Sequence, residues 1–214
     1  MTDIQSAASL ISLLLCFLIG QKLPFKQLSK DKQSQHLVFA STVCLFLLWM
    51  FQTGIAGSPT VHFLWLSALP LVLGFRWAIF STLIALVALT ILGIESYEML
   101  GVNFLLGCLA PIALTYGIYS LSFHKLPKNV FVYIFVCAFI PGALTIGLKM
   151  LLLSGYFYLD GFYTWQYIMD NYLMLITLLA FPEAMFNGMT ITLLIIYKPQ
   201  WVYTFHDKFY LSKK

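Results

Sequence analysis

The sequence has few charged residues. Aspartate, glutamate, lysine and arginine together make up 9% of its 214 residues, whereas 61% are hydrophobic. An ordinary soluble domain carries roughly 25% charged residues, so this composition excludes one. The mean hydropathy of +0.89 and apolar runs of roughly 17 to 25 residues predict an integral membrane protein with room for about six or seven spanning helices. We expect one all-α, polytopic membrane domain over residues 1–214.

Cysteine is scarce as well, and sequence motifs for catalysis are lacking. Cys16, Cys44, Cys108 and Cys137 stand singly inside apolar runs, so neither a disulfide framework nor a zinc cluster is predicted. The chain contains no P-loop, nucleophile elbow, HExxH motif or dinucleotide fingerprint. We therefore expect a chain that is not an enzyme and has no intrinsic cofactor. Most of the basic residues flank the apolar runs, which membrane topology explains, so no nucleic-acid partner is expected.

Hydropathy and loop charge together predict about seven transmembrane helices and their orientation. The predicted spans cover residues 7–20, 36–56, 58–75, 77–93, 99–120, 130–155 and 172–197. Basic residues then fall in alternate loops and acidic residues in the others, provided that Lys149 belongs to the sixth helix and snorkels outward. This pattern predicts an amino terminus outside the cell and a carboxyl terminus in the cytoplasm.

Polar residues in or beside the apolar runs are candidate functional positions. His62 stands at the mouth of the apolar segment 58–74, where it either rests at the membrane interface or catches a substrate. Glu183 falls near the middle of the last predicted span, with Asn187 one turn later on the same face. A carboxyl group there either ties helices together, with Asn187 as its partner, or binds a substrate or gates a proton.

Two stretches, TVHFLWLSALPLVLGFRWAIF and GVNFLLGCLAPIALTYGIYSL, resemble segments of a known family. They are similar to the CbiM/NikM cobalt and nickel permeases of energy-coupling-factor (ECF) transporters, in a divergent proteobacterial branch. His62 matches the histidine that opens a helix in this family, and Asn103 matches an asparagine at the external side. The further matches are Gly74, Trp77, Ala78, Gly107, Pro111, Tyr116 and Tyr119.

The resemblance implies a substrate-binding membrane subunit for transition-metal uptake in the bacterial inner membrane. Its partners would be a transmembrane coupling subunit and ATP-binding cassette ATPases, with membrane lipid around it, and its substrate would be cobalt, nickel or zinc. The family holds its metal with a histidine directly after the initiator methionine and with the matching third-helix histidine. This chain begins Met-Thr-Asp. The resemblance implies His62 as a metal ligand and Asn103 as a supporting residue. Asp3 is the nearest replacement donor, and we expect that Asp3, His62 and one external acid would form a mixed nitrogen and oxygen site.

Two other functions stay open from the sequence. One is a permease of the same fold for an organic or vitamin-like substrate, in a cavity lined by Trp65, Tyr97 and the aromatic residues of 156–167. The other is a membrane accessory protein with no role in transport. Neighbouring genes for a coupling subunit and an ATPase would favour transport over the accessory role.

Overall fold

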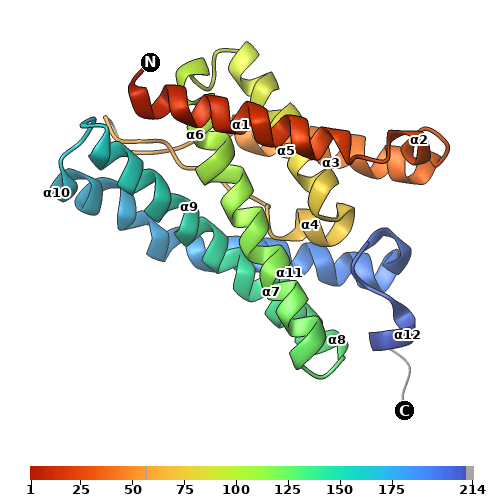
Figure 1. Cartoon of the computed structure of the whole chain (residues 1–214). Coiled ribbons are helices and arrows are strands. Elements are labelled where there is room, and N and C mark those ends of the chain that lie inside the picture. The colour runs from red at the N-terminus through yellow and green to blue at the C-terminus, as the bar shows by residue number, and fades with distance from the viewer. Residues whose placement is uncertain (56, 211–214) are drawn as a thin grey trace.

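The computed structural model describes residues 1–55 and 57–210, which form a bundle of helices (Figure 1). The α-helices are α1 (Asp3–Gln21), α2 (Phe25–Leu28), α3 (Lys32–Met50), α4 (Ala68–Leu73), α5 (Phe75–Ile91), α6 (Leu100–Val102), α7 (Ala110–Lys125), α8 (Val130–Val132), α9 (Ile140–Leu159), α10 (Trp165–Ile168), α11 (Leu175–Tyr197) and α12 (Asp207–Tyr210). The π-helical segments η2 (Asn103–Leu109), η3 (Tyr133–Phe139) and η4 (Met169–Leu173) and the 3-10 turns η1 (Tyr97–Met99) and η5 (Pro199–Trp201) complete them.

Several of these elements join into helices that are long and apolar enough to cross a membrane. Within the described residues there are five such helices: Asp3–Gln21, Lys32–Met50, Tyr97–Lys125, Val130–Leu159 and Trp165–Tyr197. Phe75–Ile91 is a shorter apolar helix. The expected all-α, multi-pass membrane bundle is therefore confirmed.

The third predicted span differs from the expectation. We expected a helix over residues 58–75, but only the six residues of α4 and Phe75, the first residue of α5, are helical there, and the stretch before α4 is not helical. An isolated antiparallel bridge joins Thr53 and Val61, with backbone N···O distances of 2.9 and 2.7 Å. Hydropathy cannot distinguish a buried extended segment from a helix, because both are continuously apolar.

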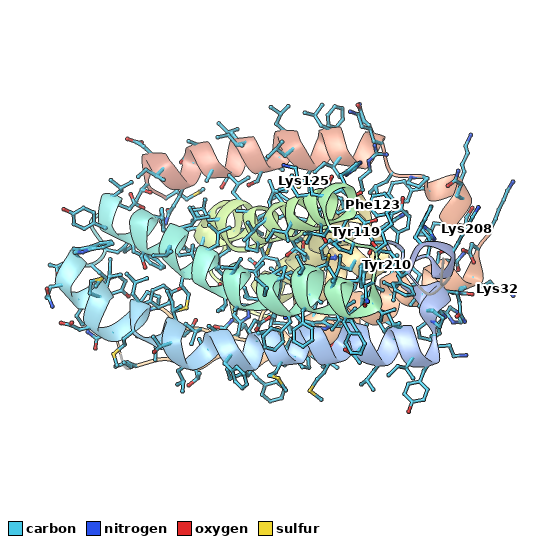
Figure 2. All side chains as sticks on the ribbon, turned by 90° about the horizontal axis from the view of Figure 1, so that it is seen from below. Lys32, Tyr119, Phe123, Lys125, Lys208 and Tyr210 are labelled. Atoms are coloured by element: carbon cyan, nitrogen blue, oxygen red, sulfur yellow. The ribbon has the colours of Figure 1, made fainter. Side chains whose placement is uncertain are left out.

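Outer and inner helices of the bundle differ in how they are buried. α1 lies on one outer side and α11 on the opposite side (Figures 1 and 2). Only 11% of the apolar window of α1 is buried, so its surface is available to lipid. Where α1 meets α6, Gly101 allows close approach, since a Cβ at this position would lie 2.6 Å from the backbone of Ser9.

Residues 203–210 pack against the bundle through aromatic rings. Tyr119, Phe123 and Tyr210 lie close together in Figure 2, and the ring of Tyr210 is 5.0 Å from that of Tyr133 on η3. The hydroxyl groups of Tyr133 and Thr204 are 2.6 Å apart. Backbone hydrogen bonds from Tyr203 and Thr204 to α4, at 3.2 and 3.1 Å, further fix this end of α4.

The helices α9 and α11 are in close contact at Gly142. A Cβ added to this glycine would lie 2.8 Å from Cα of Ala184 and 3.0 Å from the carbonyl oxygen of Glu183. Both of these atoms belong to the backbone of α11, so neither can rotate away. The absence of a side chain at Gly142 therefore sets the distance between the two helices.

We predict that Gly142→Ala separates α9 from α11 and lowers stability by roughly 1–3 kcal/mol, the usual cost of overpacking. The measurement is the thermal unfolding midpoint of the purified protein in detergent. Gly117→Ala in α7 is the matched control, because nothing lies within 4 Å of a Cβ built there. Equal midpoints for the two variants would contradict the packing argument.

Candidate functional site

The candidate site is built on residues 57–67, which we call the extended segment. It has no helical hydrogen bonds of its own, yet Leu64 and Leu66 are fully buried. Non-helical backbone at membrane depth is tolerated only where protein or a water-filled cavity surrounds it, because lipid cannot satisfy its polar groups. The backbone N–H groups of this segment therefore need partners from other elements.

Glu183 and Asn187 on α11 provide these partners. The backbone N–H groups of Leu64 and Trp65 donate to the two carboxylate oxygens of Glu183, at 2.9 and 2.7 Å. The N–H of Ala68, at the start of α4, donates to Oδ1 of Asn187 at 2.8 Å. Asn187 Nδ2 in turn donates to Oε1 of Glu183 at 2.8 Å. Glu183 and Asn187 are fully buried, and together they stabilise the segment as a cap stabilises the end of a helix.

Trp65 shows how firmly the segment is held. Its φ angle is +53°, a value that residues with bulky side chains rarely adopt. Besides its backbone bond to Glu183, its indole Nε1 donates to the hydroxyl of Thr190 at 3.0 Å. The Trp65 side chain is thus held against α11. It is not among the described residues that line the cavity beside His62.

His62 lies on the extended segment, three residues before Trp65, and its two ring nitrogens have different partners. Nδ1 is 3.0 Å from the carbonyl oxygen of Phe63. A carbonyl only accepts hydrogen bonds, so Nδ1 is the donor and carries a proton. Nε2 is 2.9 Å from Nζ of Lys149. The ring also packs against Trp49, with centroids 5.3 Å apart.

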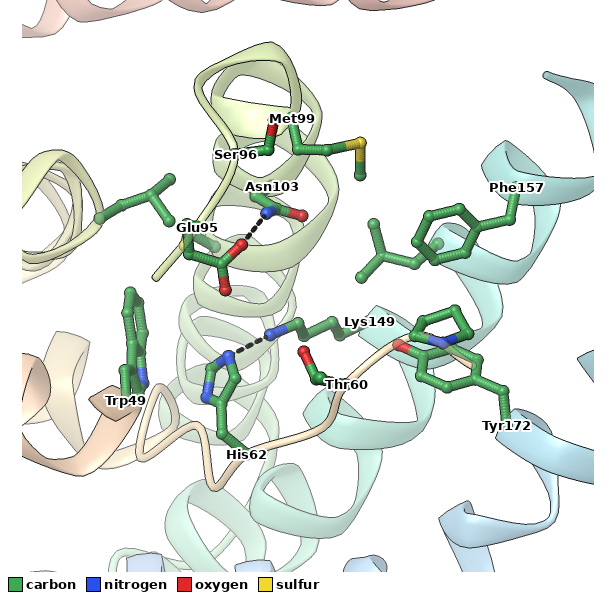
Figure 3. Close-up of a pocket in the computed structure, with 14 residues that line it drawn as sticks. Trp49, Thr60, His62, Glu95, Ser96, Met99, Asn103, Lys149, Phe157 and Tyr172 are labelled. Atoms are coloured by element: carbon green, nitrogen blue, oxygen red, sulfur yellow. Dashed lines mark hydrogen bonds between the residues drawn. The ribbon is translucent and has the colours of Figure 1, made fainter. Parts of the chain in front are cut away.

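Lys149 differs from the sequence-based expectation. We expected its side chain to snorkel outward, but it turns into the bundle from α9 and reaches His62 (Figure 3). Lys149 lies ten residues before the end of α9, about 15 Å at the usual helical rise, which is too far for a lysine side chain to span. The side chain passes Gly107 on η2, where an added Cβ would be in ordinary van der Waals contact with Cε of Lys149, at 3.4 Å.

His62 and Lys149 face a cavity of about 180 Å³. Its lining includes Trp49, Glu95, Asn103, Cys108 and Tyr172. The carboxylate of Glu95 lies above the His62–Lys149 pair in Figure 3. It accepts from Asn103 Nδ2 at 2.9 Å and from Gln52 Nε2 at 2.7 Å. The cavity thus combines one imidazole, one ammonium group and one fixed carboxylate.

Comparison with known proteins agrees with this architecture. A family model described as the cobalt uptake substrate-specific transmembrane region, CbiM, matches residues 3–201. The chain belongs to the CbiM family. A truncated transition metal transporter of known structure is similar in fold, with a TM-score of 0.74 and 19% identity over 90% of this chain and 95% of that one. A second transition metal transporter has a TM-score of 0.72 and 20% identity, over 89% and 88% of the two chains. No curated protein matches the sequence.

Membership of the CbiM family makes the chain a membrane component of transition-metal uptake. The resemblance that was noted in the sequence is confirmed. In this family the metal is a substrate and not a cofactor that stays bound to the protein. The structure brings together two of the predicted site residues, since His62 and Asn103 both line the cavity. Glu183 and Asn187 instead lie behind the extended segment and hold it in place.

Asp3 is not among the described residues that line the cavity. It is the first residue of α1, in a region fixed by other contacts. The amino group of Met1 lies 3.6 Å from the carboxylate of Glu98, and the hydroxyl of Thr2 donates to Asp160 at 2.7 Å. Over residues 1–55 and 57–210, no three His, Cys, Asp or Glu side chains are grouped to hold a metal ion. The ligand role of Asp3 therefore stays a prediction.

Sequence reasoning missed Lys149 and Glu95 as parts of the site. The sequence indicates Glu95 only as one of several acidic residues at the external face, near His62 and Asn103, and nothing in its own segment indicates that Gln52 and Asn103 bind it. Lys149 did give a signal, since it is a lysine deep inside an apolar helix. Ionisable residues within membrane helices usually face the interior of the bundle or a water-filled cavity, and this rule would have favoured the inward orientation.

We predict that Glu183→Gln lowers stability by roughly 1–3 kcal/mol, because an amide nitrogen would face a backbone N–H and leave two donors without an acceptor. The thermal unfolding midpoint in detergent measures this change. The matched control is Asp170→Asn, an acid-to-amide change at an exposed residue. If the two variants unfold at the same temperature, the carboxylate does not stabilise the extended segment.

Proposed function

We propose that this chain is the substrate-binding subunit of an ECF-type transporter that imports a transition-metal cation across the bacterial inner membrane. Transport is powered by a separate transmembrane coupling subunit and by ATP-binding cassette ATPases. The observation that supports this proposal is the position of His62. Its Nε2 faces a cavity near one end of the bundle, within a chain that matches a cobalt uptake family over residues 3–201.

The residues of the site divide into three roles in this proposal. His62 coordinates the metal, because a neutral imidazole nitrogen is a preferred ligand of cobalt, nickel and zinc. Asn103 supports the site by donating to Glu95, and thereby fixes the carboxylate at the cavity. Glu183 and Asn187 position His62 indirectly, since they hold the backbone two to six residues after it.

The membrane orientation follows from the charges. Met1, Glu95 and Glu98 lie at the end of the bundle where the cavity is, whereas the loop that contains Lys22, Lys26 and Lys30 lies at the other end of α1. Lysine and arginine are retained on the cytoplasmic side of membrane proteins. These charges support the proposed orientation, with the cavity toward the outside, as an uptake component requires, and the carboxyl terminus in the cytoplasm.

We predict that cells that express the gene accumulate more of one transition metal than cells that lack it, and that His62→Ala removes the difference. Whole-cell metal content, measured by mass spectrometry for cobalt, nickel and zinc together, is the readout. His36→Ala is the control, because this histidine is exposed in the first turns of α3. No difference in any metal between cells with and without the gene would contradict uptake.

A further inference from the structure

The position that a metal ion would take on His62 is already occupied by a cation of the protein itself. A metal binds imidazole through the lone pair of an unprotonated ring nitrogen. In this chain Nδ1 donates to Phe63, so Nε2 carries the lone pair, and it faces Nζ of Lys149 at 2.9 Å. Nζ of Lys149 donates to this lone pair, and it therefore stands in the position that a metal ion on Nε2 would need.

The charges of the cavity do not favour a bare divalent cation. Lys149 and Glu95 are the lining residues with ordinarily charged side chains, and their charges cancel. The carboxylate of Glu95 already accepts hydrogen bonds from Gln52 and Asn103. A metal ion on His62 would stand within a few ångströms of the ammonium group, in surroundings where like charges repel more strongly than in water.

Within the described part of the chain, the side chains near His62 also offer few ligands for a bare ion. Transition metals in proteins take four to six ligands, and no group of three potential His, Cys, Asp or Glu ligands exists among the residues described. The cavity of about 180 Å³ is much larger than a single ion needs, so it has room for ligands that enter with the metal. Lys149 is then well placed to bind a negatively charged group of such a ligand.

We propose that the substrate is a transition-metal ion complexed by a small carboxylate chelator, and not the bare ion. His62 coordinates the metal through Nε2, and Lys149 moves from His62 to a carboxylate of the chelator. This inference rests on the proposed metal uptake and names the chemical form in which the metal is bound.

Binding to the purified chain in nanodiscs, measured by isothermal titration in a non-coordinating buffer, tests the inference. The probes are cobalt chloride, the 1:1 cobalt–citrate complex and metal-free citrate. We expect the wild-type chain to bind cobalt–citrate at least about ten times more tightly than either other probe, a difference of one decade in Kd. Lys149→Met, which keeps the length of the side chain but not its charge, should weaken cobalt–citrate binding by a similar factor and should not weaken binding of cobalt chloride.

The control variant is Lys125→Met, at the exposed end of α7, which should leave all three affinities unchanged. Two results would overturn the inference without affecting metal uptake as such: tighter binding of cobalt chloride than of cobalt–citrate, or equal affinities of wild type and Lys149→Met for cobalt–citrate. Equally tight binding of metal-free citrate would also overturn it, since the anion alone would then be the ligand. If Lys149→Met does not fold, the comparison of the three probes on the wild-type chain still tests whether the chelated metal is the preferred ligand.

Discussion

The carboxylate of Glu183 is the interaction on which the site depends. It accepts the N–H groups of Leu64 and Trp65 from a segment that has no helical hydrogen bonds of its own. In the interior of a membrane protein, water is not freely available to replace such a partner, so an unpaired N–H there costs the full desolvation penalty. The buried carboxylate on α11 therefore stabilises the extended segment beside it by accepting these hydrogen bonds.

The extended geometry decides where His62 points. In a helix, successive side chains fan out around the axis, and a histidine one turn before Trp65 would share its face. In the extended segment, Trp65 instead bonds to Thr190 on α11, while His62 faces Lys149 and the cavity. The contacts of Glu183 and Asn187 with Leu64, Trp65 and Ala68 therefore affect the chemistry at His62 without touching it.

The membrane class and most of the helices could be predicted from the sequence, because long apolar runs suffice to locate α1, α3, α9 and α11. The extended segment could not. Its run of apolar residues predicts a helix. The Glu183 and Asn187 side chains that hold it in its extended form lie 119 positions later in the sequence, on α11. The resemblance singled out His62 and Asn103, and in the structure both residues line one cavity. It said nothing about Lys149, which lies outside the two matching stretches.

The orientation of Lys149 is difficult to predict from the sequence for a physical reason. A lysine in the middle of a long helix is costly in lipid and has to find a polar partner inside the protein. Which partner it finds depends on space as well as charge. The side chain passes Gly107 on η2 and ends at His62. It does not pair with Glu183, although that residue is a buried acid. Glu183 already accepts three hydrogen bonds through its carboxylate, from Leu64, Trp65 and Asn187. Lys149 Nζ instead meets the lone pair of His62 Nε2, 2.9 Å away in the cavity.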